Sequence, residues 1–288
     1  MSAAARPLNR YRIRRSLGRS LLYLLLIGIA LLYFIPFVWL VITSLKPINQ
    51  VFTDPIRWIP DPIAWENYAL ALTNPSFQYG RLLTNTLFYA GLSTLGIVLS
   101  SALVAYGFAW QDFWGKNTLF GITLATMMLP AVVTLIPTYI IFRTVGWVGT
   151  YAPLIVPAFL GSAFNIFLLR QFMLTIPTDL SDAAKVDGAG EFTIFWRIML
   201  PLVKPALMVV AVLHFLYAYN DFQGPLIYLT DYNDYPLVLG LYAFQTRMRV
   251  EWHLMMAATM SVTLPLIVLF FVAQRYFIEG ITLSGLKG

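Results

Sequence analysis

The sequence is poor in side chains that catalyse reactions or bind metals. Its 288 residues include no cysteine and only two histidines, His214 and His253. No segment matches G-x-x-x-x-G-K-[ST], whose backbone amides cradle nucleotide phosphates, or H-E-x-x-H, which binds zinc. Disulfides and thiolate metal sites are therefore excluded. We expect this chain to hold no catalytic residue, metal or cofactor, so any chemical energy must arrive from another subunit.

A group of polar side chains lies at the end of an apolar stretch, residues 205–220. His214 lies within it, where a polar group is costly unless it is satisfied. We interpret His214 as a partner in a helix–helix hydrogen bond, with a pathway role as the alternative. Amides, acids and aromatic faces suit a hydroxyl-rich solute, although an aromatic belt at the membrane interface explains tyrosines equally well. The candidate substrate-pathway residues are His214, Tyr217, Asn220, Asp221 and Gln223.

Residues 177–190 read as a short helix followed by a glycine turn. Thr178 is placed to act as the N-cap, with its hydroxyl accepting from a free amide. Asp179 and Asp182 fall near the first turn, where the helix dipole favours negative charge. Gly188 suits the left-handed residue that ends a helix. The sequence therefore predicts a helix of little more than two turns.

A second, strongly apolar helix is predicted over Glu191–Leu200, and Pro201 interrupts it. In the first helix, Leu180, Ala183 and Ala184 share one face with Asp187. Small alanines allow a partner's backbone to approach closely. Together the two helices predict an element that lies along the membrane face and receives force from a soluble subunit.

This segment resembles the cytoplasmic loop of permease subunits of ABC importers. The family's signature is E-A-A, three residues, G, nine residues and I-x-L-P. The spacing here is complete, and the one departure is Asp182 in place of Glu, an acid with a shorter reach. In the family this loop is the coupling helix that docks in a cleft of the ATPase. The resemblance implies these ATPase-coupling residues: Asp182, Ala183, Ala184, Lys185, Asp187, Gly188, Ile198, Leu200 and Pro201.

The end of the chain, Phe277–Gly288, resembles that of the smaller permease of the maltose-type carbohydrate family. The resemblance implies four partners: a second permease, an ATPase dimer that binds ATP and Mg, an extracytoplasmic solute-binding protein and a sugar or polyol. It also implies that the tail reaches toward the ATPase and that the last outer loop probes the binding protein. The identity of the sugar is not encoded in these motifs.

Composition and apolar runs predict the elements that carry these residues. The chain is 59% hydrophobic and 11% charged, with a mean hydropathy of +0.73, whereas soluble domains are about 25% charged. We therefore expect an all-α, polytopic membrane protein. The second apolar stretch opens with the polar run 84–86, in which we interpret Asn85 as a packing residue. Six spans long enough for a bilayer are expected at about 21–44, 82–110, 117–142, 144–169, 205–222 and 254–276.

The placement of Lys and Arg predicts the topology. With the amino terminus inside, 13 of the 19 basic residues fall on inside segments and 6 on outside segments. Because positive residues resist translocation, we expect both termini in the cytoplasm, and the resemblance to ABC importer permeases implies a bacterial inner membrane. The first span is too long for a cleaved signal. The expected organisation is a basic amino terminus (1–20), a permease domain (21–278) with a coupling loop (171–204), and a tail (279–288).

These predictions lead to alternating access as the mechanism, in a heterodimer of two similar permeases. ATP binding would close the ATPase dimer, and the docked loop would tilt the spans. The alternatives are a secondary carrier driven by an ion gradient and a membrane-embedded enzyme. A carrier would favour paired buried charges and an inverted repeat, neither of which the sequence shows. Nucleic-acid binding is not expected, because the basic amino-terminal residues read as a topology signal beside anionic lipid.

Overall fold

The computed structural model describes residues 8–245 and 250–285, with side chains described for residues 18–245 and 250–274. The described residues form helices and connecting loops without a β-strand, so the predicted all-α class is confirmed. The chain divides into two compact units, residues 1–71 with 248–260 and residues 72–247 with 261–288. Lys287 and residues 286–288 of the expected tail lie outside the described residues, as do the side chains of 279–285.

The first unit is built on one long apolar helix. Helix α1 (Leu8–Ser44) is followed by the short η1 (Ile48–Gln50) and α2 (Glu66–Leu72). Buried Asn67 of α2 donates hydrogen bonds of 2.9 Å to the carbonyls of Ser44 and Lys46. These bonds satisfy carbonyls that the end of α1 leaves without helical partners.

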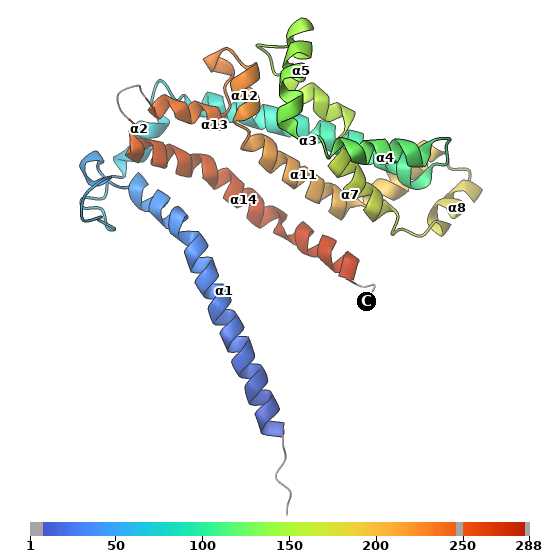
Figure 1. Ribbon diagram of the computed structural model, residues 1–288, viewed down its shortest axis with the longest axis horizontal. Helices are drawn as coiled ribbons and strands as arrows, with labels where there is room; N and C mark the ends of the chain where they lie inside the picture. The colour runs from blue at the N-terminus through green and yellow to red at the C-terminus, as the bar shows by residue number, and fades with distance from the viewer. Residues whose placement is uncertain (1–7, 246–249, 286–288) are drawn as a thin grey trace, which may run out of the picture. The chain divides into compact units, whose positions relative to one another are not determined.

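Helix α3 (Tyr79–Trp110) is the central element of the second unit. It packs along α11 (Lys204–Tyr219), along α7 (Ala163–Met173), and along η2 (Val156–Leu160). A Cβ at Gly96 would lie 2.6 Å from the Phe159 ring, so glycine is what allows α3 and η2 to approach so closely. In Figure 1, α8 lies at one end of this unit, and α12 and α13 lie at the other.

The second unit's remaining helices fall into two groups. Before α8 come α4 (Lys116–Thr126), α5 (Ala131–Thr144) and α6 (Ala152–Ile155). After α11 come short elements that lead to the last long helix: α12 (Gln223–Tyr228), η4 (Tyr232–Asp234), α13 (Leu237–Gly240), η5 (Leu241–Phe244) and α14 (Trp252–Gly285), whose first residues belong to the first unit.

Four helices in the described part of the chain are long and apolar enough to cross a membrane: Gly18–Ser44, Tyr79–Trp110, Ala152–Met173 and Trp252–Gln274. Two bent pairs raise the number to as many as six. The expected span 117–142 consists of α4 and α5, which meet at 99°. Pro130 immediately precedes α5 with extended backbone, because proline lacks the amide that a continuing helix needs. The expected span 144–169 is also displaced, since α5 runs to Thr144 and the next helix begins at Ala152.

The core of the second unit gathers around the carboxyl-terminal half of α3. Its fully buried side chains come from α7, from the segment Glu191–Leu202, from the junction that follows it and from α11. They include Leu169, Met173, Ile194, Met199, Val203 and Val210. This apolar cluster fixes the base on which α8 rests.

Candidate functional site

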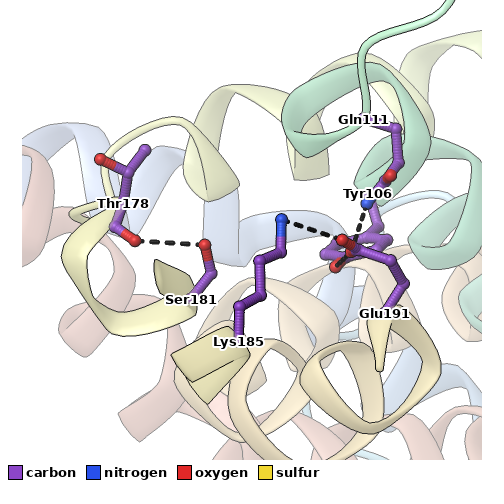
Figure 2. Close-up of polar contacts among 6 residues, drawn as sticks. All are labelled: Tyr106, Gln111, Thr178, Ser181, Lys185 and Glu191. Carbon is purple, nitrogen blue, oxygen red and sulfur yellow. Dashed lines mark hydrogen bonds and ion pairs between the residues drawn. The ribbon is translucent and has the colours of Figure 1, made fainter. Parts of the chain in front are cut away.

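Helix α8 (Asp179–Val186) is the short helix predicted by the sequence. Asp179 and Asp182 lie in its first turn and Lys185 in its last, so both charges complement the helix dipole. Thr178 occupies the predicted N-cap position, but the predicted capping bond is wrong: its backbone angles are already helical and its hydroxyl makes no capping bond. Instead the Ser181 hydroxyl donates to the Thr178 carbonyl over 3.1 Å (Figure 2), a bond within the first turn.

Gly188 ends α8 as predicted, in the left-handed region with φ +83°. The Gly188 amide donates to the Lys185 carbonyl over 3.0 Å, and the Ala189 amide donates to the Ala184 carbonyl over 2.9 Å. These two bonds are the pair that defines a Schellman motif, and they satisfy carbonyls at the end of the helix. The glycine turn therefore fixes where α8 stops and where the chain turns toward the next helix.

The helix after the turn continues beyond the predicted Leu200, as α9 (Glu191–Ile194), the π-helical η3 (Phe195–Met199) and α10 (Leu200–Leu202). The Leu200 amide bonds to the Phe195 carbonyl, five residues earlier. This wider turn precedes Pro201, whose ring would collide with the carbonyl of Arg197 in a regular α-helix. The chain bends by 76° only after Leu202, where α11 begins.

The signature residues separate into an exposed group and a packed group. Asp182, Ala183, Lys185, Asp187 and Gly188 are exposed. By contrast, Ala184 is half-buried against the core cluster, as are Ile198 and Leu200. Pro201 is exposed on α10. The structure thus places the first half of the signature on a surface and uses most of the second half to hold that surface to the core.

Glu191, which the sequence reasoning did not single out, connects three elements at this site. One carboxylate oxygen lies 2.9 Å from the Lys185 Nζ of α8. The other accepts from the hydroxyl of buried Tyr106 over 2.7 Å and from the Gln111 amide over 2.5 Å (Figure 2). Tyr106 and Gln111 lie 85 and 80 residues earlier in the chain, so no local pattern could have identified the cluster.

The hydrogen bond and the negative charge of Glu191 raise the pKa of Lys185 above its ordinary value. Both side chains remain close to half-exposed, at 49% for Lys185 and 45% for Glu191. The pair is therefore screened by water and makes only a small contribution to folding. Its geometry matters more than its energy.

An open cleft of about 440 Å³ lies between α8 and the end of α3. Its lining is mixed, with apolar Trp110 and Ile176 beside polar Ser181 and Asp182. Asp112 and Lys116 form an exposed ion pair of 3.4 Å on another part of its rim.

The predicted pathway residues lie at the far end of α11, and the structure connects only some of them. Asp221 accepts from the Tyr89 hydroxyl of α3 over 2.9 Å and from the Gly224 amide over 3.0 Å. Asn220 bonds within its own helix. Tyr217 is 68% exposed, with its ring 6.0 Å from that of His214, and Gln223 is also exposed. Tyr89, which the sequence reasoning missed, is the buried partner of this group.

The structure does not support the predicted helix–helix hydrogen bond of His214. Its Nε2 atom is buried and has no hydrogen-bond partner among the residues that the structure describes. The neighbouring aromatic ring of Tyr217 packs beside it, one turn along the same helix. Burial of His214 therefore comes from packing rather than from a polar partner on another helix.

The polar run at the start of α3 anchors the loop after α12. Asn85 donates to the carbonyls of Asn233 and Tyr235 over 2.7 and 3.0 Å. The hydroxyl of buried Thr86 accepts from the Leu237 amide over 2.8 Å and donates to its own helix. Asn85 therefore does more than the packing role predicted for it, because it satisfies the backbone of a segment about 150 residues away.

Comparison with protein families decides what these helices belong to. Residues 96–282 match the family described as "Binding-protein-dependent transport system inner membrane component". The chain belongs to this family. It is accordingly a membrane-embedded permease subunit of an ATP-driven importer and not an enzyme, as the cytoplasmic-loop signature predicted.

Relatives of this permease match over nearly their whole length. The chain is 33% identical to the arabinooligosaccharides transport system permease protein AraQ of Bacillus subtilis, covering 95% of this chain and 97% of the relative. It is 32% identical to the sn-glycerol-3-phosphate transport system permease protein UgpE of Yersinia pestis, covering 93% and 97%. The predicted resemblance to carbohydrate importer permeases is confirmed by these matches.

The permease fold is also found among solved structures. A chain of a bacterial ABC transporter that imports the acidic polysaccharide alginate aligns with a TM-score of 0.80 at 22% identity, over 96% of this chain and all of that one. At this identity the match establishes the fold alone. Within the described residues, no group of three or more His, Cys, Asp or Glu side chains could hold a metal ion.

Proposed function

We propose that this permease imports a sugar or related polyol and is driven through α8 by a separate ATPase. The proposed partners are a second permease, an ATPase dimer that binds ATP and Mg, and an extracytoplasmic solute-binding protein. The observation that carries the proposal is the exposed face Asp182–Gly188, closed by the Gly188 turn and seated on the core through Ala184. Both termini are proposed to lie in the cytoplasm, which places α8 on the ATPase side.

The exposed face of α8 suits insertion into a partner's groove. Ala183 presents only a methyl group, so a partner's backbone can approach closely, while Asp182 and Lys185 offer charges on the same short helix. Because α8 has 8 residues, it is too short to be stable alone and depends on its seat. A push on α8 is therefore transmitted to α3 and α11 through the core cluster rather than dissipated in a flexible loop.

The substrate class rests on the relatives. Both AraQ and UgpE are named as transporting polyhydroxylated solutes, one of them oligosaccharides and the other a phosphorylated polyol. At the far end of α11 we propose that Tyr217 and Gln223, which are exposed, contact the solute. Asn220, Asp221 and His214 complete the proposed pathway group, with Asp221 oriented by Tyr89.

Substituting Ala183 tests the coupling role. Ala183→Arg adds a bulky cation to the exposed face without disturbing the core. We expect solute uptake to fall at least about tenfold, equivalent to ~1.4 kcal/mol, while membrane insertion and expression stay at parental levels. Asn117→Arg, an equally exposed substitution on α4, is the matched control and should retain uptake. Parental uptake by Ala183→Arg would contradict the coupling role.

Uptake of labelled solutes by a strain lacking the parental importer tests the substrate class. The panel should include arabinooligosaccharides, other neutral oligosaccharides, sn-glycerol-3-phosphate, amino acids and a short peptide, each with and without this chain. Uptake of a sugar or polyol that depends on the chain supports the proposal. Uptake confined to amino acids or peptides would contradict it.

A further inference from the structure

We infer that Glu191 is a positioning residue that ties the coupling helix α8 to the end of α3. This inference rests on the proposed coupling function and adds a residue outside the signature. Glu191 lies three residues after the Gly188 turn, at the start of α9. Its two carboxylate oxygens face different elements, one toward α8 and the other toward α3 and the residue that follows it.

Few contacts besides the ion pair with Glu191 hold α8 in place. The hydrogen bonds of its hydroxyl and turn residues run within residues 178–189. Ser181 and half-buried Ala184 supply its packing, and the rest of the helix is exposed. Among the described residues, the Lys185–Glu191 ion pair is the side-chain polar contact between α8 and another helix. Its loss would leave α8 held by two small side chains.

The other oxygen of the Glu191 carboxylate is held by a buried tyrosine. Tyr106 is 5% exposed, its ring packs 5.2 Å from that of Phe195, and its hydroxyl points at Glu191 (Figure 2). A buried tyrosine is a fixed donor, so it holds one oxygen of Glu191 in place. Gln111, just beyond α3, donates to the same oxygen. Glu191 is thus anchored to α3 and presents its free oxygen to Lys185.

The three partners of Glu191 match an ionised carboxylate. Both of its oxygens accept, and all three partners are donors: an ammonium, a hydroxyl and an amide. A glutamine offers one acceptor, so its amide group would face a donor on one of the two sides. Since half-exposed pairs contribute little to stability, the arrangement serves to fix the angle of α8 relative to α3.

The test measures transport per ATP hydrolysed in the full importer reconstituted in liposomes, with Glu191→Gln in this chain. We expect the ATPase to co-purify as with the parent, whereas solute transported per ATP falls about three- to tenfold. Tyr106→Phe keeps the ring packing and removes only the donor, so we expect a smaller loss in the same direction. Glu66→Gln makes the same change at an exposed acid of α2, outside this site, and should change neither quantity.

A spin label at Ala183→Cys gives a readout that a general loss of stability would not change. The chain contains no native cysteine, so the label is unique. We expect Glu191→Gln to broaden the range of α8 orientations while the unfolding midpoint stays close to that of the parent. Parental transport per ATP in Glu191→Gln, with the ATPase bound, would overturn the positioning role and leave docking intact. Failure of the parent chain to co-purify an ATPase would overturn the proposed coupling function itself, and the positioning role with it.

Discussion

The two ends of helix α3 hold neighbouring segments by different means. At its amino-terminal end, two neutral side chains bind a loop through backbone atoms: Asn85 donates to the carbonyls of Asn233 and Tyr235, and Thr86 accepts from the Leu237 amide. At its carboxyl-terminal end, Tyr106 bonds to a half-exposed acid that forms an ion pair with Lys185. The first set of contacts is partly or fully buried and specific to one backbone path, whereas the second is charged and open to water.

The contacts at the amino-terminal end of α3 therefore hold their segment in one position, whereas those at the carboxyl-terminal end allow α8 to move. A buried backbone amide that loses its partner pays a full desolvation cost, so the loop at Leu237 has one favourable position. A half-exposed ion pair contributes little energy, so the Lys185–Glu191 pair sets the resting angle of α8 and a docked partner can shift that angle at small cost. The energetics therefore fit a fixed scaffold at the amino-terminal end of α3 and a movable lever at its carboxyl-terminal end, and each end predicts a different response to substitution.

The largest expected effect is on the anchored end. Thr86→Val keeps the shape of the side chain and leaves the buried Leu237 amide without its acceptor. We expect the free energy of unfolding to fall by about 1–3 kcal/mol, measured by denaturation in mixed micelles. In Thr123→Val the lost hydroxyl bonds only to the Leu119 carbonyl of its own helix, and this control should stay close to the parent. Equal stability of the two variants would remove the distinction between the ends.

Gly188→Ala should give the next largest effect, and this effect falls on α8. Alanine in the left-handed region costs about 1–2 kcal/mol, although there is room for its methyl group. We expect faster hydrogen exchange at the amides of 182–189 and reduced uptake. Gly190 has equal space and extended backbone, with φ −76°, so Gly190→Ala should leave both quantities unchanged. Slow exchange in Gly188→Ala would show that the turn does not hold α8.

A smaller loss is expected from Asn85→Ala. The Tyr235 carbonyl loses its donor and the Asn233 carbonyl keeps only the one from Arg81. Both residues are half-buried, so water can replace part of the loss. We expect a loss of about 1 kcal/mol and faster exchange confined to residues 231–237. Exchange that spreads instead to α8 would mean that the two ends of α3 are not independent.

The smallest effect on stability is expected from Glu191→Gln, because its ion pair is exposed. The unfolding midpoint should stay within about 2 °C of the parent, measured by thermal unfolding in detergent. A large drop in the unfolding midpoint would show that the Glu191 cluster stabilises the fold as the buried contacts at the other end of α3 do.

Local sequence patterns predicted much of α8 and little of how α8 is attached to α3. The acids of the first turn, the helix itself and Gly188 follow from residues within ten positions of one another, and the structure has all of them. The Thr178 cap was wrong because its backbone is already helical, so the free amides lie outside the reach of its hydroxyl. Tyr106 and Gln111 could not be found, since their contact with Glu191 depends on how α3 packs against α9.

The apolar runs predicted where helices lie but not how they bend. A run of hydropathy over 117–142 looks continuous, while the helices α4 and α5 within it meet at 99° beside Pro130. In the same way, Asn85 and Asp221 are polar residues near the ends of apolar runs. The sequence could not distinguish an anchor of the loop from a solute contact, because the partner backbone is about 150 residues from Asn85 and Tyr89 is about 130 residues from Asp221.

Crosslinking tests the central claim, that α8 is where the ATPase docks, most directly. A single cysteine at Ala183 is compared with one at Thr84, which is exposed at the other end of α3, in membranes that contain the whole importer. We expect Ala183→Cys to be crosslinked to the ATP-hydrolysing subunit and Thr84→Cys not to be. Absence of that product at Ala183, or accessibility of this residue from the periplasmic side, would contradict it.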